Sequence, residues 1–103
     1  MVLLHSIENG VMRIALNRPN SYNAFNREMA LALQGLLDAA AEDEQVRAIL
    51  LTGEGKAFCS GQDLGEAIDP VGPGLDRILN EHYNPLVLKM RSVLKPIVVA
   101  VNG

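Results

Sequence analysis

The chain of 103 residues predicts an α/β fold in which helices pack against a β-sheet. Three observations carry this prediction. Two apolar runs flank an Asn-Gly pair near the N-terminus, as in a β-hairpin. Two later segments repeat apolar residues every three or four positions, which is typical of amphipathic helices. Each of these segments precedes a largely apolar run typical of a buried strand, at residues 46–52 and 97–101.

The first half of the chain predicts a hairpin, a loop and a helix. Residues 3–8 and 11–16 flank Asn9-Gly10, which is the strongest short signal for a hairpin. Residues 17–23 are expected to form a loop, and Asn26 is expected to cap the helix that follows it. The apolar face of this helix would consist of Met29, Leu33, Leu36, Leu37 and Ala40.

The second half predicts a loop between two helical segments and then a strand. Residues 66–68 are expected to form a short helix. Residues 69–74 must form a loop, because two prolines and two glycines interrupt regular structure there. A second amphipathic helix should run from residue 75 to 93, with Pro85 kinking or restarting it. We expect the strand at 97–101 to be buried on both faces.

Composition and charge argue against several classes of function. The net charge is −3, and acidic and basic residues are mixed along the chain, which argues against nucleic-acid binding. Cys59 is the only cysteine, so it cannot form an internal disulfide, and it fits a reducing compartment. The apolar runs are too short to cross a bilayer, and the N-terminus lacks signal-peptide features. We therefore expect a cytoplasmic location, no membrane partner and, with two isolated histidines, no metal site.

The segment 57–64, with the sequence AFCSGQDL, carries the strongest functional signal. It follows the strand predicted at 46–52, and its Gly61 allows the backbone to approach a ligand closely. The N–H groups that open a helix have no partner within it, so they can hold an anion or a polarised carbonyl oxygen. The segment is thus a candidate oxyanion site, with a tight turn that binds nothing as the alternative.

Three motifs together resemble the crotonase family, the enoyl-CoA hydratases and isomerases. They are NRP at 17–19 with NAF at 23–25, then GKAFCSGQDL at 55–64, then KPIVVAVNG at 95–103. Each motif is weak alone, and the three in the family's order are specific. The resemblance implies a spiral of ββα units. Residues 1–103 would be the N-terminal part of a single such domain, ending before its second oxyanion-hole segment.

The resemblance also implies an acyl-CoA substrate and no bound prosthetic group. Two backbone N–H groups would hold the thioester oxygen, the first from Gln62 and the second from a glycine-rich segment that follows residue 103. The catalytic carboxylates would lie there too. One such donor typically contributes ~3 kcal/mol to the stability of the enolate. The residues expected to bind CoA are Tyr22, Ala24, Ser60, Gly61, Gln62, Asp63 and Leu64. The acyl pocket would be lined by Leu79, His82, Tyr83 and Leu86.

Several of these residues have a second interpretation. Asp63 is expected to cap the following helix, with a catalytic acid as the alternative. Arg18 would either pair with a CoA phosphate or cap a strand end. Residues 22–24 either lie along the CoA nucleotide or simply connect a strand to a helix. His82 either packs within the apolar face of its helix or lines the acyl pocket.

The leading functional hypothesis is an acyl-CoA isomerase. SGQDL at 60–64, the loop 69–74 and YNPLV at 83–87 most resemble the ring-epoxide isomerases of phenylacetate degradation. The alternatives are an enoyl-CoA hydratase of fatty-acid-type β-oxidation and a non-catalytic scaffold of the crotonase fold. The family resemblance implies homotrimers or homohexamers. We expect residues 1–103 alone to be inactive and to need association with further chain, since strand 97–101 would otherwise stay uncovered.

Overall fold

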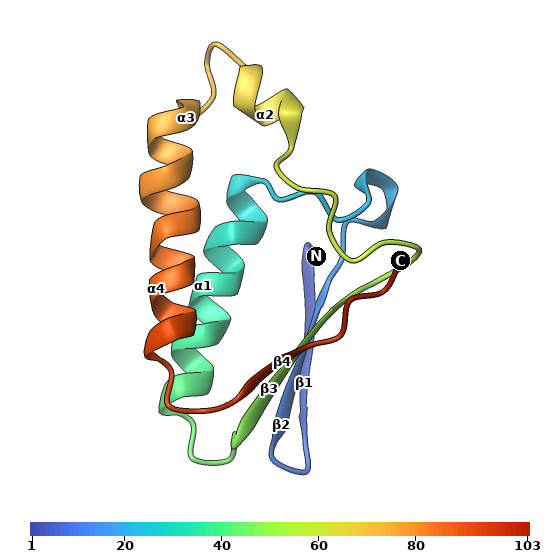
Figure 1. Cartoon of the computed structure of the whole chain (residues 1–103), viewed down its shortest axis with the longest axis vertical. Coiled ribbons are helices and arrows are strands. Elements are labelled where there is room, and N and C mark those ends of the chain that lie inside the picture. Colours follow the sequence, from blue (N-terminus) through green and yellow to red (C-terminus); the bar gives the residue numbers. More distant parts are fainter.

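A four-stranded sheet in the order β1-β2-β3-β4 forms one layer of the computed structural model, which describes residues 1–103. The strands are β1 (Leu3–Glu8), β2 (Val11–Leu16), β3 (Ala48–Gly53) and β4 (Ile97–Val99). β1 and β2 are antiparallel, and β3 and β4 add in parallel. The long helices lie together on one face of this sheet (Figure 1). The predicted α/β class is confirmed.

The helical elements connect these strands. In chain order they are η1 (Pro19–Ser21), α1 (Arg27–Glu42), α2 (Leu64–Ile68), α3 (Gly74–Arg77), the π-helical segment η2 (Ile78–Tyr83) and α4 (Asn84–Ser92). The structure has no helix with the length and apolar character needed to span a bilayer.

The N-terminal hairpin forms where the Asn-Gly pair predicts it. Asn9 and Gly10 both have positive φ, at 53° and 83°, as the two central residues of a type I′ turn require. Glu8 and Val11 are paired directly across the turn. The turn therefore sets the register that carries alternate residues of β2 toward the helices.

The hydrophobic core lies between α1 and one face of β2 and β3. Met12, Ile14 and Leu16 alternate along β2, and the first two pair with Ile49 and Leu51 of β3. The α1 residues in this core are Met29, Leu33, Leu37 and Ala40. Leu36, which was expected on the same helix face, is only half-buried at its edge. Each large aliphatic side chain buried here contributes roughly 1.5–3 kcal/mol by leaving water.

Side chains form hydrogen bonds with the backbone N–H and C=O groups at both ends of α1. The Asn26 Oδ1 accepts a hydrogen bond from the Met29 N–H at 2.9 Å, which confirms the predicted cap. The other end is acidic and has no basic residue in its last turn. Lys95 supplies the missing cation from the α4–β4 connection, because its Nζ donates to the carbonyls of Ala40 and Asp43 at 2.5 and 2.8 Å.

The helical segment around Pro85 changes its hydrogen-bonding pattern. Because proline has no N–H, the Glu81 carbonyl lacks the donor that an α-helix would supply four residues later. Gln34 of α1 compensates, since its Nε2 donates to Glu81 O at 2.8 Å and to His82 O at 3.0 Å. The segment is π-helical up to Tyr83 and resumes as α4 just before Pro85, so the predicted restart is confirmed.

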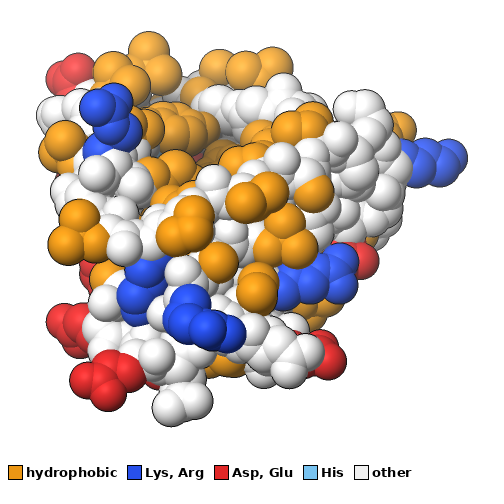
Figure 2. Space-filling view, turned by 60° about the horizontal axis from the view of Figure 1, so that its bottom comes forward, with side chains coloured by type: hydrophobic (Ala, Val, Ile, Leu, Met, Phe, Trp, Pro, Cys, Tyr) orange, Lys and Arg blue, Asp and Glu red, His pale blue; other side chains and the backbone are white.

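Two strand predictions need correction. The strand predicted at 46–52 is β3 at 48–53, and Val46 is buried in the turn before it. The strand predicted at 97–101 is only Ile97–Val99, and it is not buried on both faces, because Val98 is 57% exposed. The reason is its position at the sheet edge, where it pairs with β3 alone. Hydrophobic side chains also reach the surface over the face shown in Figure 2.

Candidate functional site

Segment 60–63 runs beside segment 22–25 like a short parallel strand. Phe25 and Gln62 form an isolated parallel bridge between them. The hydrogen bonds run from Ser60 N to Tyr22 O (3.0 Å), from Phe25 N to Gly61 O (2.7 Å) and from Asp63 N to Phe25 O (2.8 Å). Two motifs that are far apart in the sequence therefore form one backbone unit.

This pairing directs the main-chain N–H of Gln62 away from Phe25. The Gly61 carbonyl and the Gln62 N–H belong to one trans peptide unit, so they point in opposite directions. Because the carbonyl is bonded to the Phe25 N–H, the Gln62 N–H faces outward, and it donates no hydrogen bond within the chain. Gly61 has φ at +122°, a conformation that favours glycine. The result is a free donor with a fixed direction.

The Asn23 side chain holds together the loops that lead to this unit. It is fully buried, and its Oδ1 accepts from the Arg18 N–H at 2.7 Å. Its Nδ2 donates to the carbonyls of Glu54 and Ala57 at 2.9 and 2.8 Å. Gly53 lies so close that a Cβ there would come within 2.9 Å of this Nδ2. The amide thus replaces backbone pairing between the loop after β2 and the loop after β3.

Asn102 provides a second connection of the same kind from the last motif. Its Nδ2 donates to the carbonyls of Gly53 and Gly55 at 2.9 and 3.1 Å, and its Oδ1 accepts from the Gly53 N–H at 3.2 Å. The loop after β3 is therefore held from both sides. The sequence motifs marked both asparagines, but no local pattern predicts these partners.

Arg18 and Asp63 form an ion pair at the end of the 60–63 segment. The Arg18 Nη2 donates to Asp63 Oδ2 at 3.0 Å, and Nη1 donates to the Ala24 carbonyl. The second Asp63 oxygen accepts from the Glu66 N–H at 3.2 Å, so the predicted cap of α2 is present. The hydrogen bond from Arg18 lowers the pKa of Asp63 below its usual value. Asp63 is therefore an ionised structural carboxylate here.

The residues expected to bind CoA lie in these two paired segments or directly after them. Tyr22, Ser60, Gly61 and Leu64 are exposed, and Gln62 and Asp63 are half-buried. Ala24 is buried, with its carbonyl bonded to Arg18. The structure brings these residues together through the pairing of 22–25 with 60–63.

The four residues expected in the acyl pocket do not line a common cavity. Leu86 is 5% exposed and belongs to the hydrophobic core, whereas Leu79 is 53% exposed. His82 is 1% exposed. Tyr83 is half-buried, and its hydroxyl donates to the Gln62 Oε1. Only Tyr83 of the four reaches the candidate site directly.

The buried His82 lies beside partly exposed charged side chains. Its Nε2 is 3.3 Å from Arg27 Nη1, and its Nδ1 is 4.0 Å from Glu66 Oε1. Because arginine can only donate, we assign Nε2 as the acceptor and place the proton on Nδ1. Burial lowers the pKa of His82, against an opposing effect of Glu66. The imidazole is thus neutral near pH 7.

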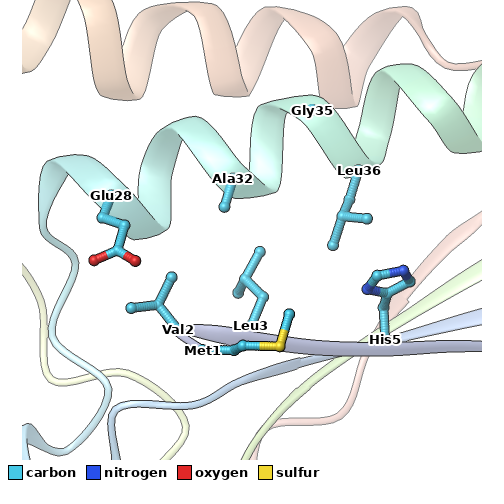
Figure 3. Close-up of a pocket in the computed structure, with 8 residues that line it drawn as sticks. All are labelled: Met1, Val2, Leu3, His5, Glu28, Ala32, Gly35 and Leu36. Atoms are coloured by element: carbon cyan, nitrogen blue, oxygen red, sulfur yellow. The ribbon is translucent and has the colours of Figure 1, made fainter.

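An apolar hollow of the structure lies away from the Gln62 donor. It has a volume of about 350 Å³ and opens between the start of β1 and α1 (Figure 3). Its lining is Met1, Val2, Leu3, His5, Glu28, Ala32, Gly35 and Leu36. No residue of 57–64 contributes to it.

Comparison with known proteins gives consistent matches. The family model for enoyl-CoA hydratase/isomerase matches residues 6–103. The 1,2-epoxyphenylacetyl-CoA isomerase of Escherichia coli K12 is 43% identical over 98% of this chain, and 2,3-dehydroadipyl-CoA hydratase of the same strain is 33% identical over 98%. The crystal structure of an enoyl-CoA hydratase/isomerase from Pseudoalteromonas atlantica T6c aligns over the whole chain with a TM-score of 0.84 at 38% identity. The chain spans 40%, 38% and 39% of these three proteins.

Removing the Asn23 amide should strongly destabilise the fold. In Asn23→Ala the Arg18 N–H and two carbonyls lose their partners, and the positive φ of 58° becomes unfavourable. We expect a loss of roughly 3 kcal/mol in the free energy of unfolding, measured with urea. Asn20→Ala, at an exposed position in η1, is the matched control and should change stability little. Equal stability of both variants would contradict the role assigned to Asn23.

The Arg18–Asp63 pair should make stability depend on acid pH. The folded-state pKa of Asp63 is lowered, so its stabilising effect is fully present above its usual value of 3.8 and disappears as the pH falls through the lower, folded-state value. Asp63→Asn keeps a capping side chain but removes the charge. The difference in unfolding free energy between the parent and this variant should therefore shrink below about pH 4. A difference that is constant from pH 7 to 2 would rule out this assignment.

Proposed function

Because the chain belongs to the enoyl-CoA hydratase/isomerase family and has the fold of its solved members, we propose that its full-length protein is an acyl-CoA isomerase that stabilises a thioester enolate. Residues 1–103 would form the N-terminal part of a single crotonase domain. The observation that carries the proposal is the free, outward-facing N–H of Gln62.

The proposed reaction needs a donor where negative charge develops. Removal of a proton next to a thioester moves charge onto the thioester oxygen, and one preorganised N–H typically stabilises this state by ~3 kcal/mol. The hydrogen bond to the Gly61 carbonyl polarises the same peptide unit and so strengthens the Gln62 donor. We place the second donor and the acid/base carboxylates outside residues 1–103.

We propose that CoA lies along the edge formed by segments 22–25 and 60–64. The exposure of Tyr22, Ser60 and Leu64 supports this placement. Ala24 would contribute through its backbone, since its side chain is buried. Leu79 and Tyr83 would approach the acyl group, with His82 and Leu86 packed behind them.

The identity of 43% to a 1,2-epoxyphenylacetyl-CoA isomerase supports a ring-epoxide substrate and a place in phenylacetate catabolism. A hydratase is the second candidate, supported by the 33% identity to 2,3-dehydroadipyl-CoA hydratase. We further propose a cytoplasmic homotrimer or homohexamer without a prosthetic group. Burial of the exposed β4 residues Val98 and Val99 against more of the chain or another subunit would fit such an assembly.

Assays on two thioesters test the proposed function. The full-length protein should isomerise 1,2-epoxyphenylacetyl-CoA with a higher kcat/KM than it shows for hydration of a 2-enoyl-CoA. The 103-residue chain alone should show negligible turnover of either. A preference for hydration would select the hydratase, and no turnover of either thioester by the full-length protein would refute both in favour of a scaffold.

A further inference from the structure

The Gln62 side chain is held at both ends of its amide group. Its Oε1 accepts from the Tyr83 hydroxyl. Its Nε2 donates to Glu66 Oε1 at 3.3 Å and to the Asp63 carbonyl at 3.1 Å. An amide can satisfy these partners in only one orientation, because one end accepts and the other donates. The side chain is therefore fixed, although the proposed chemistry needs only the main chain.

The two side-chain partners belong to separate helical elements. Glu66 lies in α2, and its second oxygen accepts from the Arg27 N–H at the start of α1, at 2.9 Å. Tyr83 ends η2, and its ring lies beside that of Phe25, with 6.1 Å between centroids. Burial raises the pKa of Tyr83, so its hydroxyl keeps the proton that it donates. The Gln62 amide thus connects the starts of α1 and α2 with the end of η2.

The backbone before Gln62 has the wide conformational freedom of glycine. Gly61 precedes it with a positive φ, and a Cβ at Gly61 would meet nothing within 4 Å. The bond from the Phe25 N–H to the Gly61 carbonyl holds the Gly61–Gln62 peptide unit from one side, but glycine has no side chain to restrict its own backbone angles. A fixed Gln62 side chain restricts the same peptide unit from the other side.

We propose that Tyr83 and Glu66 are positioning residues that orient the Gln62 main-chain N–H by holding the Gln62 side chain. This inference rests on the proposed function, in which that N–H contacts the thioester oxygen. Tyr83 would exert this effect through its hydroxyl and the Gln62 amide, separately from the approach of its ring to the acyl group, and Glu66 does not need to touch the substrate. A misplacement of about 1 Å at a reacting centre lowers rates by on the order of a hundredfold, so loss of this anchor should be visible in turnover.

The test compares Tyr83→Phe and Gln62→Met in the full-length protein. Both remove hydrogen bonds with little change in shape. We expect kcat to fall by on the order of tenfold to a hundredfold, with KM changed by less than about threefold. The infrared band of a bound ¹³C-labelled thioester carbonyl should shift back toward its position in water. The double variant should be no slower than the slower single variant. Gln45→Met, at an exposed position, is the matched control and should resemble the parent.

The pH dependence of kcat in Gln62→Glu distinguishes a positioning role from a purely structural one, because a purely structural role would leave this dependence unchanged. The introduced carboxyl group would lie next to Glu66, so its pKa should be raised. When protonated it can donate and accept as the amide does, and when ionised it cannot donate to Glu66. The kcat of this variant, relative to the parent, should therefore rise as the pH falls. If Tyr83→Phe fails to fold, this pH profile alone decides whether the Gln62 side chain has the proposed positioning role.

The outcomes separate the two proposals. The positioning role is overturned if the parent polarises the thioester carbonyl but Tyr83→Phe and Gln62→Met keep both the carbonyl band and kcat of the parent. A flat relative pH profile for Gln62→Glu also overturns it. If the parent itself neither turns over the thioester nor shifts its carbonyl band, the proposed function fails first and the positioning role fails with it.

Discussion

The buried amide of Asn23 is the constraint on which the candidate site depends. Three backbone groups from the loops after β2 and β3 have this side chain as their hydrogen-bond partner. Leaving one such buried group unsatisfied costs about 1–3 kcal/mol, so the loops cannot separate without a large loss. The close approach of Gly53 to the same amide shows how little space remains. Asparagine also tolerates the left-handed backbone conformation at this position.

The direction of one N–H group follows from this constraint in short steps. The loops held by Asn23 place segment 22–25 beside 60–63, and the Phe25 N–H then binds the Gly61 carbonyl. Because this peptide unit is planar and trans, the Gln62 N–H points opposite to the Gly61 carbonyl and therefore outward, away from Phe25. The ion pair of Arg18 with Asp63 holds the far end of the segment at the start of α2. Rigid packing, rather than any reactive side chain, thus produces the chemical feature on which the proposed function rests.

Local patterns predicted the hairpin, the Asn26 and Asp63 caps and the helix restart near Pro85, because each depends on residues close in sequence. They also marked segment 57–64, whose glycine and helix start are local features. Contacts across more than thirty residues were not predictable in this way. Examples are the bonds from Asn23 to Glu54 and Ala57 and the bonds from Asn102 to Gly53 and Gly55. The Tyr83–Gln62 bond, across 21 residues, was not predictable either. The β-branched character of residues 97–101 predicted burial, but the edge position of β4 leaves Val98 exposed.

The amide resonance of Gln62 tests the central claim most directly. It can be followed in the full-length protein labelled with ¹⁵N-glutamine, and assigned as the signal that is lost in Gln62→Met. Without ligand this N–H should exchange readily with solvent, because it has no acceptor in the chain. Saturation with a non-reactive acyl-CoA thioester should move its proton signal downfield and slow its exchange, whereas CoA without the acyl group should do neither. A Gln62 signal that is unchanged at saturation with the thioester would contradict the account.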